Sequence, residues 1–131
     1  MPVTFLTINE VPERDMAVLE VLHDSIQMSE WDDFVKGCAR LMACEQSHLV
    51  LDLRRLERVL SVFIGESVRL NSEAVNRGKR FTVLAAGQVG EVFKMLLGSD
   101  LLEIVTDGKP PEELESPEER RARRSSRWKL K

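Results

Sequence analysis

The 131-residue sequence contains no apolar run close to the roughly 18 residues that a membrane-spanning helix needs. Residues 1–4 lack the basic flank and the apolar block of a signal peptide. Tyrosine is absent and aromatic residues make up only 5% of the chain, yet 43% of it is apolar, which is enough for one compact core. We therefore expect a soluble, cytoplasmic protein with a single folded domain.

Cysteine is scarce as well, since only Cys38 and Cys44 are present. They are six residues apart on a predicted helix, where a turn of about 100° per residue points them to sides about 120° apart. Two cysteines so placed cannot form a disulfide with each other. We expect free, buried thiols, as in a reducing compartment.

Motifs of enzymes and cofactor sites are also missing. No serine lies in a Gly-x-Ser-x-Gly turn, and there is no phosphate-binding glycine loop. His23 and His48, with Asp24 and Asp52, form a conceivable metal set, but two isolated histidines are more often structural. We expect a non-enzymatic protein without cofactor, metal or small ligand.

What the sequence does contain is an alternation of strand and helix patterns. Short apolar runs predict strands over residues 3–8, 16–22, 48–53, 81–86 and 101–105, with a polar hairpin connection over residues 9–15. Apolar residues at steps of three and four predict helices over residues 29–43, 61–77 and 88–97. Such alternation is typical of an α/β fold, here a mixed, mainly parallel sheet of about five strands with three to four helices, occupying residues 1–106.

The same periodicity predicts which side chains face the core. The helix over 29–43 should bury one stripe and begin with a capping pair of Ser29 and Asp32; the stripe comprises Trp31, Phe34, Val35, Cys38, Leu41 and Met42. The helix that begins at Ser61 should present one apolar side and end at Gly78; that side comprises Ile64, Val68, Asn71 and Val75. In the helix over 88–97, Val89, Val92, Phe93 and Leu96 should face inward, and Gly98 should end the helix. The run over residues 48–53 should be a strand that is buried on both faces.

Residues 48–105 resemble the STAS domain, the fold of bacterial anti-sigma-factor antagonists. In that family a buried strand, like residues 49–53 here, is followed by a five-residue loop and the motif Asp-Ser-Ser/Thr-Gly-Leu-Gly at a helix start. The corresponding residues here are Leu60, Ser61, Val62, Phe63, Ile64 and Gly65, at the same spacing. The family's helix end at Arg-Gly corresponds to Arg77 and Gly78, and the next strand, helix and closing strand correspond to residues 81–84, 89–96 and 101–105. A weaker likeness extends back to Met16.

Only the first serine and the last glycine of the family motif are retained, as Ser61 and Gly65. The resemblance implies that Ser61 is the serine phosphorylated by a partner kinase, and a phosphate there would meet the free N–H groups of a helix start. The alternative is that the Ser61 hydroxyl only caps the helix. Phe63, in place of a family glycine, either packs under the turn or joins an exposed docking patch formed by residues 60–65.

The resemblance implies a regulatory module that binds another protein through residues 60–65 and the helix that follows. Its implied partner is an anti-sigma factor of the histidine-kinase-like ATPase type, released when Ser61 is phosphorylated. One alternative is a structural STAS subunit of a larger signalling scaffold or of an ATP-driven lipid transporter. Another alternative depends on the C-terminal tail.

Charge is unevenly distributed along the chain. Residues 120–131 contain seven basic and no acidic residues, which leaves 12 basic and 22 acidic residues in the rest. We expect residues 107–131 to form a charged, flexible tail, because they contain too few apolar residues to offset the entropy of ordering. The acidic domain disfavours nucleic acid, but the tail could contact nucleic acid or an anionic membrane. The residues for such contacts are Arg120, Arg121, Arg123, Arg124, Arg127 and Trp128.

Overall fold

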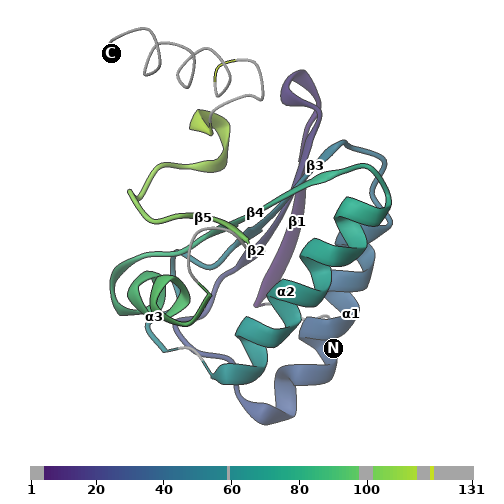
Figure 1. Ribbon diagram of the computed structural model, residues 1–131. Helices are drawn as coiled ribbons and strands as arrows, with labels where there is room; N and C mark the ends of the chain where they lie inside the picture. The colour runs from purple at the N-terminus through teal and green to yellow at the C-terminus, as the bar shows by residue number, and fades with distance from the viewer. Residues whose placement is uncertain (1–4, 59, 98–101, 115–118, 120–131) are drawn as a thin grey trace, which may run out of the picture.

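The computed structural model describes residues 5–58, 60–97, 102–114 and 119 (Figure 1). The described chain contains five strands, namely β1 (Leu6–Val11), β2 (Met16–Val21), β3 (His48–Asp52), β4 (Arg80–Leu84) and β5 (Glu103–Val105). Its three α-helices are α1 (Trp31–Met42), α2 (Ser61–Asn76) and α3 (Gly87–Leu97), and three short 3₁₀ turns are η1 (Pro12–Arg14), η2 (Met28–Glu30) and η3 (Pro111–Glu113). The predicted α/β class with a mainly parallel sheet is thereby confirmed.

The strands lie in the sheet in the order of the sequence, β1 to β5. β1 and β2 form an antiparallel hairpin, and every later pair is parallel. The connection is tighter than the sequence indicated, because β1 continues to Val11 and the turn ends at Asp15 in a left-handed conformation (φ 51°). The N-terminal part of the first predicted strand, before Phe5, lies outside the described residues.

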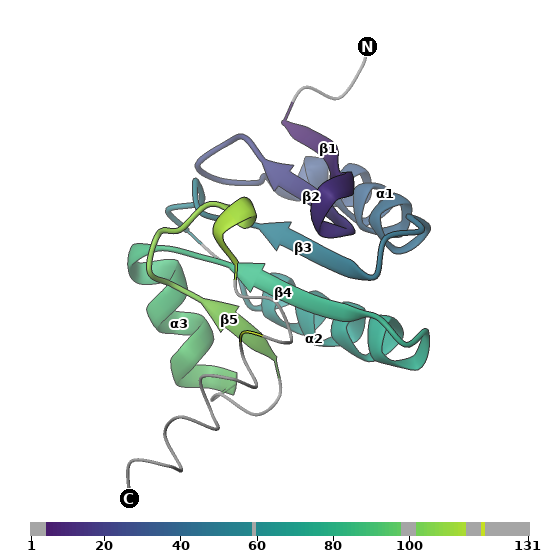
Figure 2. The same ribbon diagram turned by 90° about the horizontal axis from the view of Figure 1, so that it is seen from above.

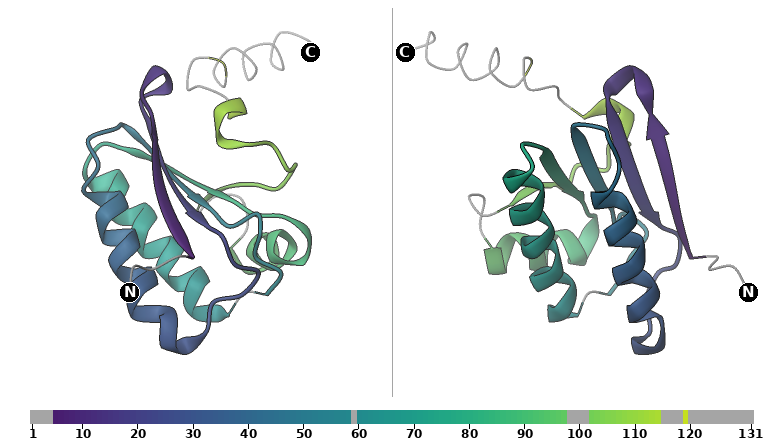
Figure 3. Two further views of the ribbon diagram at one scale, coloured as in Figure 1. Left: turned by 180° about the vertical axis from the view of Figure 1, so that it is seen from behind. Right: turned by 90° about the vertical axis from the view of Figure 1, so that its right-hand side faces the viewer.

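This strand order determines where the helices lie. Each connection from β2 to β5 moves one strand further in the same direction, and right-handed crossovers then place every helix on the same face of the sheet. Figures 2 and 3 show α1 and α2 side by side on that face, the first face, while residues 107–114 cross the opposite, second face. Among the described residues, the second face therefore has none of the three α-helices and carries only the short 3₁₀ turn η3.

Each face of the sheet has its own apolar cluster. The large first cluster joins the helices to alternate strand residues such as Leu49, Leu51 and Val83. The small second cluster consists of Val11, Met16, Val18, Val50, Leu84 and Leu114, with Val105 packed against it. All five residues of β3 are buried, which confirms the predicted strand with two buried faces.

Helix α1 buries the predicted stripe but begins differently. Phe34, Cys38, Leu41 and Met42 are buried, and Trp31 and Val35 are partly buried. Ser29 does not cap the helix; it lies within η2, where Gln27 and Glu30 form a reciprocal capping pair, with the Gln27 N–H donating to Glu30 Oε1 over 2.9 Å. The longer Gln and Glu side chains thus satisfy the first free N–H groups.

Helix α2 differs from prediction in the face it buries, although its end is as expected. The buried residues are Phe63, Ile64, Ser67, Leu70 and Ala74, whereas Val75 is 60% exposed. Of the predicted side, Ile64 is buried and Val68 and Asn71 are partly buried, so the buried side is shifted by about one residue. Phe63 packs inward, and the Ser67 hydroxyl donates to the Phe63 carbonyl over 2.8 Å, which offsets the cost of burying that hydroxyl. Gly78 ends the helix as predicted.

The end of α2 is a Schellman motif. Gly78 has φ 74°, its N–H donates to the Val75 carbonyl over 2.9 Å, and the Lys79 N–H donates to the Ala74 carbonyl over 2.8 Å. In α3, Val89 and Phe93 are buried and Val92 is partly buried, as predicted. The predicted inward side chain of Leu96 and the stop at Gly98 lie outside the description.

The described part of the expected tail differs from the prediction. Residues 107–114 were expected to be mobile, yet Pro111 is buried and Leu114 is only 4% exposed in the second cluster. The physical reason is the helix-free face: its apolar residues need cover, and residues 107–114 supply it. The interaction residues predicted between Arg120 and Trp128 lie outside the described residues.

Cys38 and Cys44 are both free, as predicted, but Cys44 is only partly buried, contrary to the expectation of two buried thiols. Cys38 is buried, and desolvation raises the pKa of its thiol to about 12, so it stays protonated at neutral pH. Within the described ranges, no helix is long and apolar enough to cross a membrane.

Candidate protein-docking surface

The loop between β3 and α2 positions the start of the helix. The Leu53 N–H donates to the Leu84 carbonyl over 2.8 Å, and the Glu57 N–H donates to the Asp24 carbonyl over 2.8 Å. Leu56, 3% exposed, packs into the first cluster between these two bonds. The loop is therefore held to the last residue of β4 and to the segment that follows β2 before the chain reaches Leu60.

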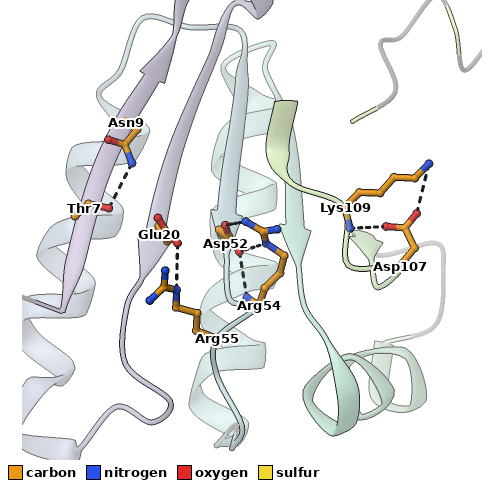
Figure 4. Close-up of polar contacts among 8 residues, drawn as sticks. All are labelled: Thr7, Asn9, Glu20, Asp52, Arg54, Arg55, Asp107 and Lys109. Atoms are coloured by element: carbon orange, nitrogen blue, oxygen red, sulfur yellow. Dashed lines mark hydrogen bonds and ion pairs between the residues drawn. The ribbon is translucent and has the colours of Figure 1, made fainter. Parts of the chain in front are cut away.

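Three arginines lie in this loop. Asp52, buried at the end of β3, accepts two bonds from the Arg54 guanidinium at 2.9 and 2.8 Å, and a third from the Arg54 N–H at 3.1 Å (Figure 4). The hydrogen bond with Asp52 raises the pKa of Arg54, which stays charged. Arg55 pairs with Glu20 over 3.5 Å, and Arg58 is exposed. Arg54 and Arg55 are therefore each paired with a strand carboxylate, and Glu57 precedes Arg58 in the same loop.

Ser61 is the first residue of α2 and is exposed. The capping position belongs to Leu60, which has extended backbone (φ −93°, ψ 153°), and no side chain caps the helix. The interpretation of Ser61 as the cap is thus wrong, because a residue at the first helical position lies past the site from which a hydroxyl caps. The first turn of α2 contains no acidic residue, whereas that of α1 contains Asp32 and Asp33.

The predicted patch of six consecutive residues divides into two sets. Leu60 and Val62 are 45% and 43% exposed, and Ser61 and Gly65 are exposed as well. Phe63 and Ile64 are only 2% and 6% exposed, so they belong to the core and not to the docking set. Of the two alternatives for Phe63, the structure has the one in which the ring packs under the turn. Helical geometry causes this division. Successive residues of an α-helix point about 100° apart around its axis, so a run of consecutive residues cannot all face the solvent.

The buried Phe63 joins the two helix starts. Its ring lies 5.0 Å from the ring of Phe34 and 5.2 Å, edge to face, from that of Trp31. Such aromatic pairs add to the free energy of burial. The ring thus holds the first turn of α2 against the first turn of α1.

Two residues that sequence reasoning did not assign to this surface extend it. Met28, in η2, is 66% exposed, and Trp31, which follows it, is half-buried against Phe63. Both helices run antiparallel to the parallel strands, so their N-terminal ends share one edge of the sheet, and the alternation of strands and helices could have indicated this. The docking surface, as used below, comprises Met28, Trp31, Leu60, Ser61, Val62 and Gly65.

Charge surrounds the docking surface asymmetrically. Acidic residues Glu30, Asp32 and Asp33 lie on the α1 side. Arg55 and Arg58 lie on the side of the loop that leads into α2. Glu20 pairs with Arg55, and Glu57 precedes Arg58, so the loop side is close to neutral while the α1 side is acidic. This difference in charge favours one orientation of a protein partner.

An open hollow of about 560 Å³ adjoins this surface, between the loop and the start of α3. It is lined by Arg54, Arg55, Leu56, Glu57, Arg58, Ala86, Gly87 and Gln88. Several of its charges are already paired, Arg54 with Asp52 and Arg55 with Glu20. The hollow therefore suits a partner side chain at the rim of an interface.

The conceivable metal set is not brought together. His48 begins β3 and pairs in register with Met16, the first residue of β2, whereas His23 and Asp24 follow the far end of β2. His48 Nε2 lies 2.8 Å from Thr82 Oγ1, and burial, with Arg80 and Arg14 nearby, lowers the pKa of His48 to about 4. Among the residues that the structure describes, no three potential ligands form a metal site.

No protein-family model matches this chain, and no curated protein matches it. The likeness to the STAS domain thus depends on the motif positions and on the order of the elements alone.

Proposed function

We propose that this chain is a non-enzymatic regulatory module that binds a partner protein through the docking surface, in the manner of a STAS-type anti-sigma-factor antagonist. The observation that carries the proposal is the exposure of Leu60 and Val62 on either side of Ser61. Neither side chain contributes to the buried core, whereas the next two residues are both buried.

The docking surface is well suited to binding because it is held in place before a partner arrives. Phe63 and Ile64 anchor the first turn in the core, and the rings of Trp31 and Phe34 pack against Phe63. A surface with little freedom to lose pays less entropy on association. Its exposed apolar side chains can then lose their contact with water to a partner.

The proposed partner is an anti-sigma factor of the histidine-kinase-like ATPase type, and the proposed switch is phosphorylation of Ser61. A phosphate carries about −1.5 to −2 charge, which the free N–H groups of the first turn stabilise. The absence of acidic residues from that turn favours such a group. The added charge between Leu60 and Val62 opposes burial of the surface and releases the partner.

Affinity capture from the source organism's lysate, followed by binding measurements with the purified partner, tests this function. The baits are the full chain and its Val62→Asp, Ser61→Asp and Ser61→Ala variants. Ser72→Asp is the matched control, because Ser72 is an exposed serine further along α2. We expect Val62→Asp and Ser61→Asp to weaken binding of a histidine-kinase-like ATPase at least about tenfold, and Ser72→Asp and Ser61→Ala to leave it within about threefold. A partner retained equally by all variants would contradict the proposal.

A further inference from the structure

The second face of the sheet is covered by a short segment without strands or α-helices. Residues 107–114 leave β5, cross this face and end, within the described chain, at η3 and Leu114 (Figure 2). Every other buried member of the second cluster belongs to a strand, so Leu114 is the residue that covers the strand residues of this cluster. Beneath it lie Val18, Val50 and Leu84, which are at most 4% exposed.

Few bonds attach this segment to the sheet. The Arg14 guanidinium donates to the Leu114 carbonyl, and it is the one hydrogen bond in the described chain that joins residues 107–114 to the rest. The backbone bonds of η3 are internal, from Glu113 to the Pro110 carbonyl (3.0 Å) and from Leu114 to the Pro111 carbonyl (3.1 Å). The far end is therefore held by the buried Leu114 and Pro111, by the bond from Arg14, and by the electrostatic attraction between Glu112 and Arg54.

The near end of the segment has the features of a hinge. Gly108 has φ 81°, and a Cβ atom placed on it would meet nothing within 4 Å. Asp107 accepts a hydrogen bond from the Lys109 N–H over 3.1 Å, which closes a local turn around Gly108 (Figure 4). The chain can rotate at this glycine without breaking a strand-to-strand bond.

We propose that residues 107–114 form a detachable strap, which opens as a unit about Gly108 and controls access to the apolar second face of the sheet. Segments with few buried contacts and few backbone bonds open locally at a much lower free energy than the whole fold. Opening the strap exposes one leucine and one proline to solvent and breaks one hydrogen bond. The strand residues of both clusters stay in place. This inference is independent of the proposed function.

Thiol labelling of matched cysteines tests the strap in the full chain. Val50→Cys and Val83→Cys carry the same substitution at positions that are both 0% exposed, on neighbouring strands and on opposite faces. Each is made in a background of Cys38→Ala and Cys44→Ser and treated with dithiobis(nitrobenzoic acid). Each rate is divided by the rate of the same variant in denaturant, which removes differences in intrinsic reactivity.

We expect Val50→Cys to react at least about tenfold faster than Val83→Cys, because strap opening exposes only the second face. Adding Leu114→Ala should accelerate Val50→Cys by about tenfold or more and Val83→Cys by less than about threefold. Leu56→Ala is the matched control, since Leu56 is equally buried outside helices and strands but in the first cluster. It should accelerate Val83→Cys at least as much as Val50→Cys.

Equal rates for the two cysteines, or equal acceleration of both by Leu114→Ala, would overturn the proposal. Either result means that the second face becomes accessible only when the whole domain unfolds.

Discussion

The two faces of the sheet differ in what covers their apolar residues. The first face is covered by three helices and contains the aromatic rings of Phe34, Phe63 and Phe93. The second face is covered by residues 107–114 and mixes a small apolar cluster with buried polar groups, namely His48, Asp52 and Thr82. From this comparison we expect most of the stability and the support of the docking surface to come from the first face, and local opening to occur at the second face.

The largest expected effect tests whether the first face carries the stability. Phe63→Ala should lower the free energy of unfolding by about 4 kcal/mol, because it removes a buried ring and leaves a cavity between α1 and α2. Val75→Ala, at a 60% exposed position on the same helix, should change it by about 0.5 kcal/mol or less. Urea denaturation measures both, and similar losses for the two variants would contradict the comparison.

Acid should weaken the fold through the second face. The pKa of His48 is about 4 in the folded protein and near 6.5 when it is unfolded, mainly because burial disfavours the charged ring. The unfolded chain therefore binds the proton more tightly, so the contribution of His48 is complete above pH 6.5 and is lost as the pH falls towards 4. The loss amounts to about 3 kcal/mol.

Unfolding measured between pH 7 and pH 4 in the wild type and in His48→Asn isolates this contribution. Carboxylates titrate in both proteins, so only the difference between the two curves belongs to His48. A difference that stays constant with pH would show that His48 does not titrate as expected.

Truncation of the strap anchor should cost less than truncation in the helical core. Leu114→Ala should lower the free energy of unfolding by about 2 kcal/mol, and Leu70→Ala, which is fully buried on α2, by about 4 kcal/mol. The difference arises because the strap can settle onto the sheet, whereas α2 is held by its neighbours. Chemical denaturation of the two variants measures these losses. A larger loss of free energy of unfolding for Leu114→Ala than for Leu70→Ala would contradict the proposed difference between the two faces.

The smallest expected effect is a gain in stability. Gly65 lies inside α2 with open space where a Cβ would point, so Gly65→Ala should stabilise the protein by about 0.5–1 kcal/mol. Gly78→Ala should instead destabilise it, since alanine resists the left-handed conformation at φ 74°. Melting temperatures should move in opposite directions for the two variants.

Local signals in the sequence predicted most of the fold. The apolar run at residues 48–53 indicated the buried β3, and Gly78 indicated the end of α2, because each feature depends on only a few neighbouring residues. The face of α2 was not predictable in this way. Its apolar residues are spread around the helix, and the packing of Phe63 against Trp31 and Phe34 determined the outcome.

Other features depend on contacts between distant parts of the chain. The burial of Leu114 follows from the helix-free second face, and its partner Arg14 is 100 residues away in the sequence. Met28 and Trp31 join the docking surface because two crossovers bring two helix ends to one edge. Leu60, Ser61, Val62 and Gly65 are exposed, as a docking set requires, whereas Phe63 and Ile64 are buried. The sequence had left the burial of Phe63 open and had placed Ile64 on the inner side of α2.

The edge-to-face contact of Trp31 with Phe63 has a spectroscopic consequence. Trp31 is the one indole in the described part of the chain, and Trp128, the second tryptophan of the sequence, can be replaced by phenylalanine. Trp31 is half-buried against Phe63 and belongs to the docking surface, so its emission wavelength and its quenching by acrylamide should respond to whatever covers that surface. The protein thus contains its own optical reporter of partner binding, without any added label.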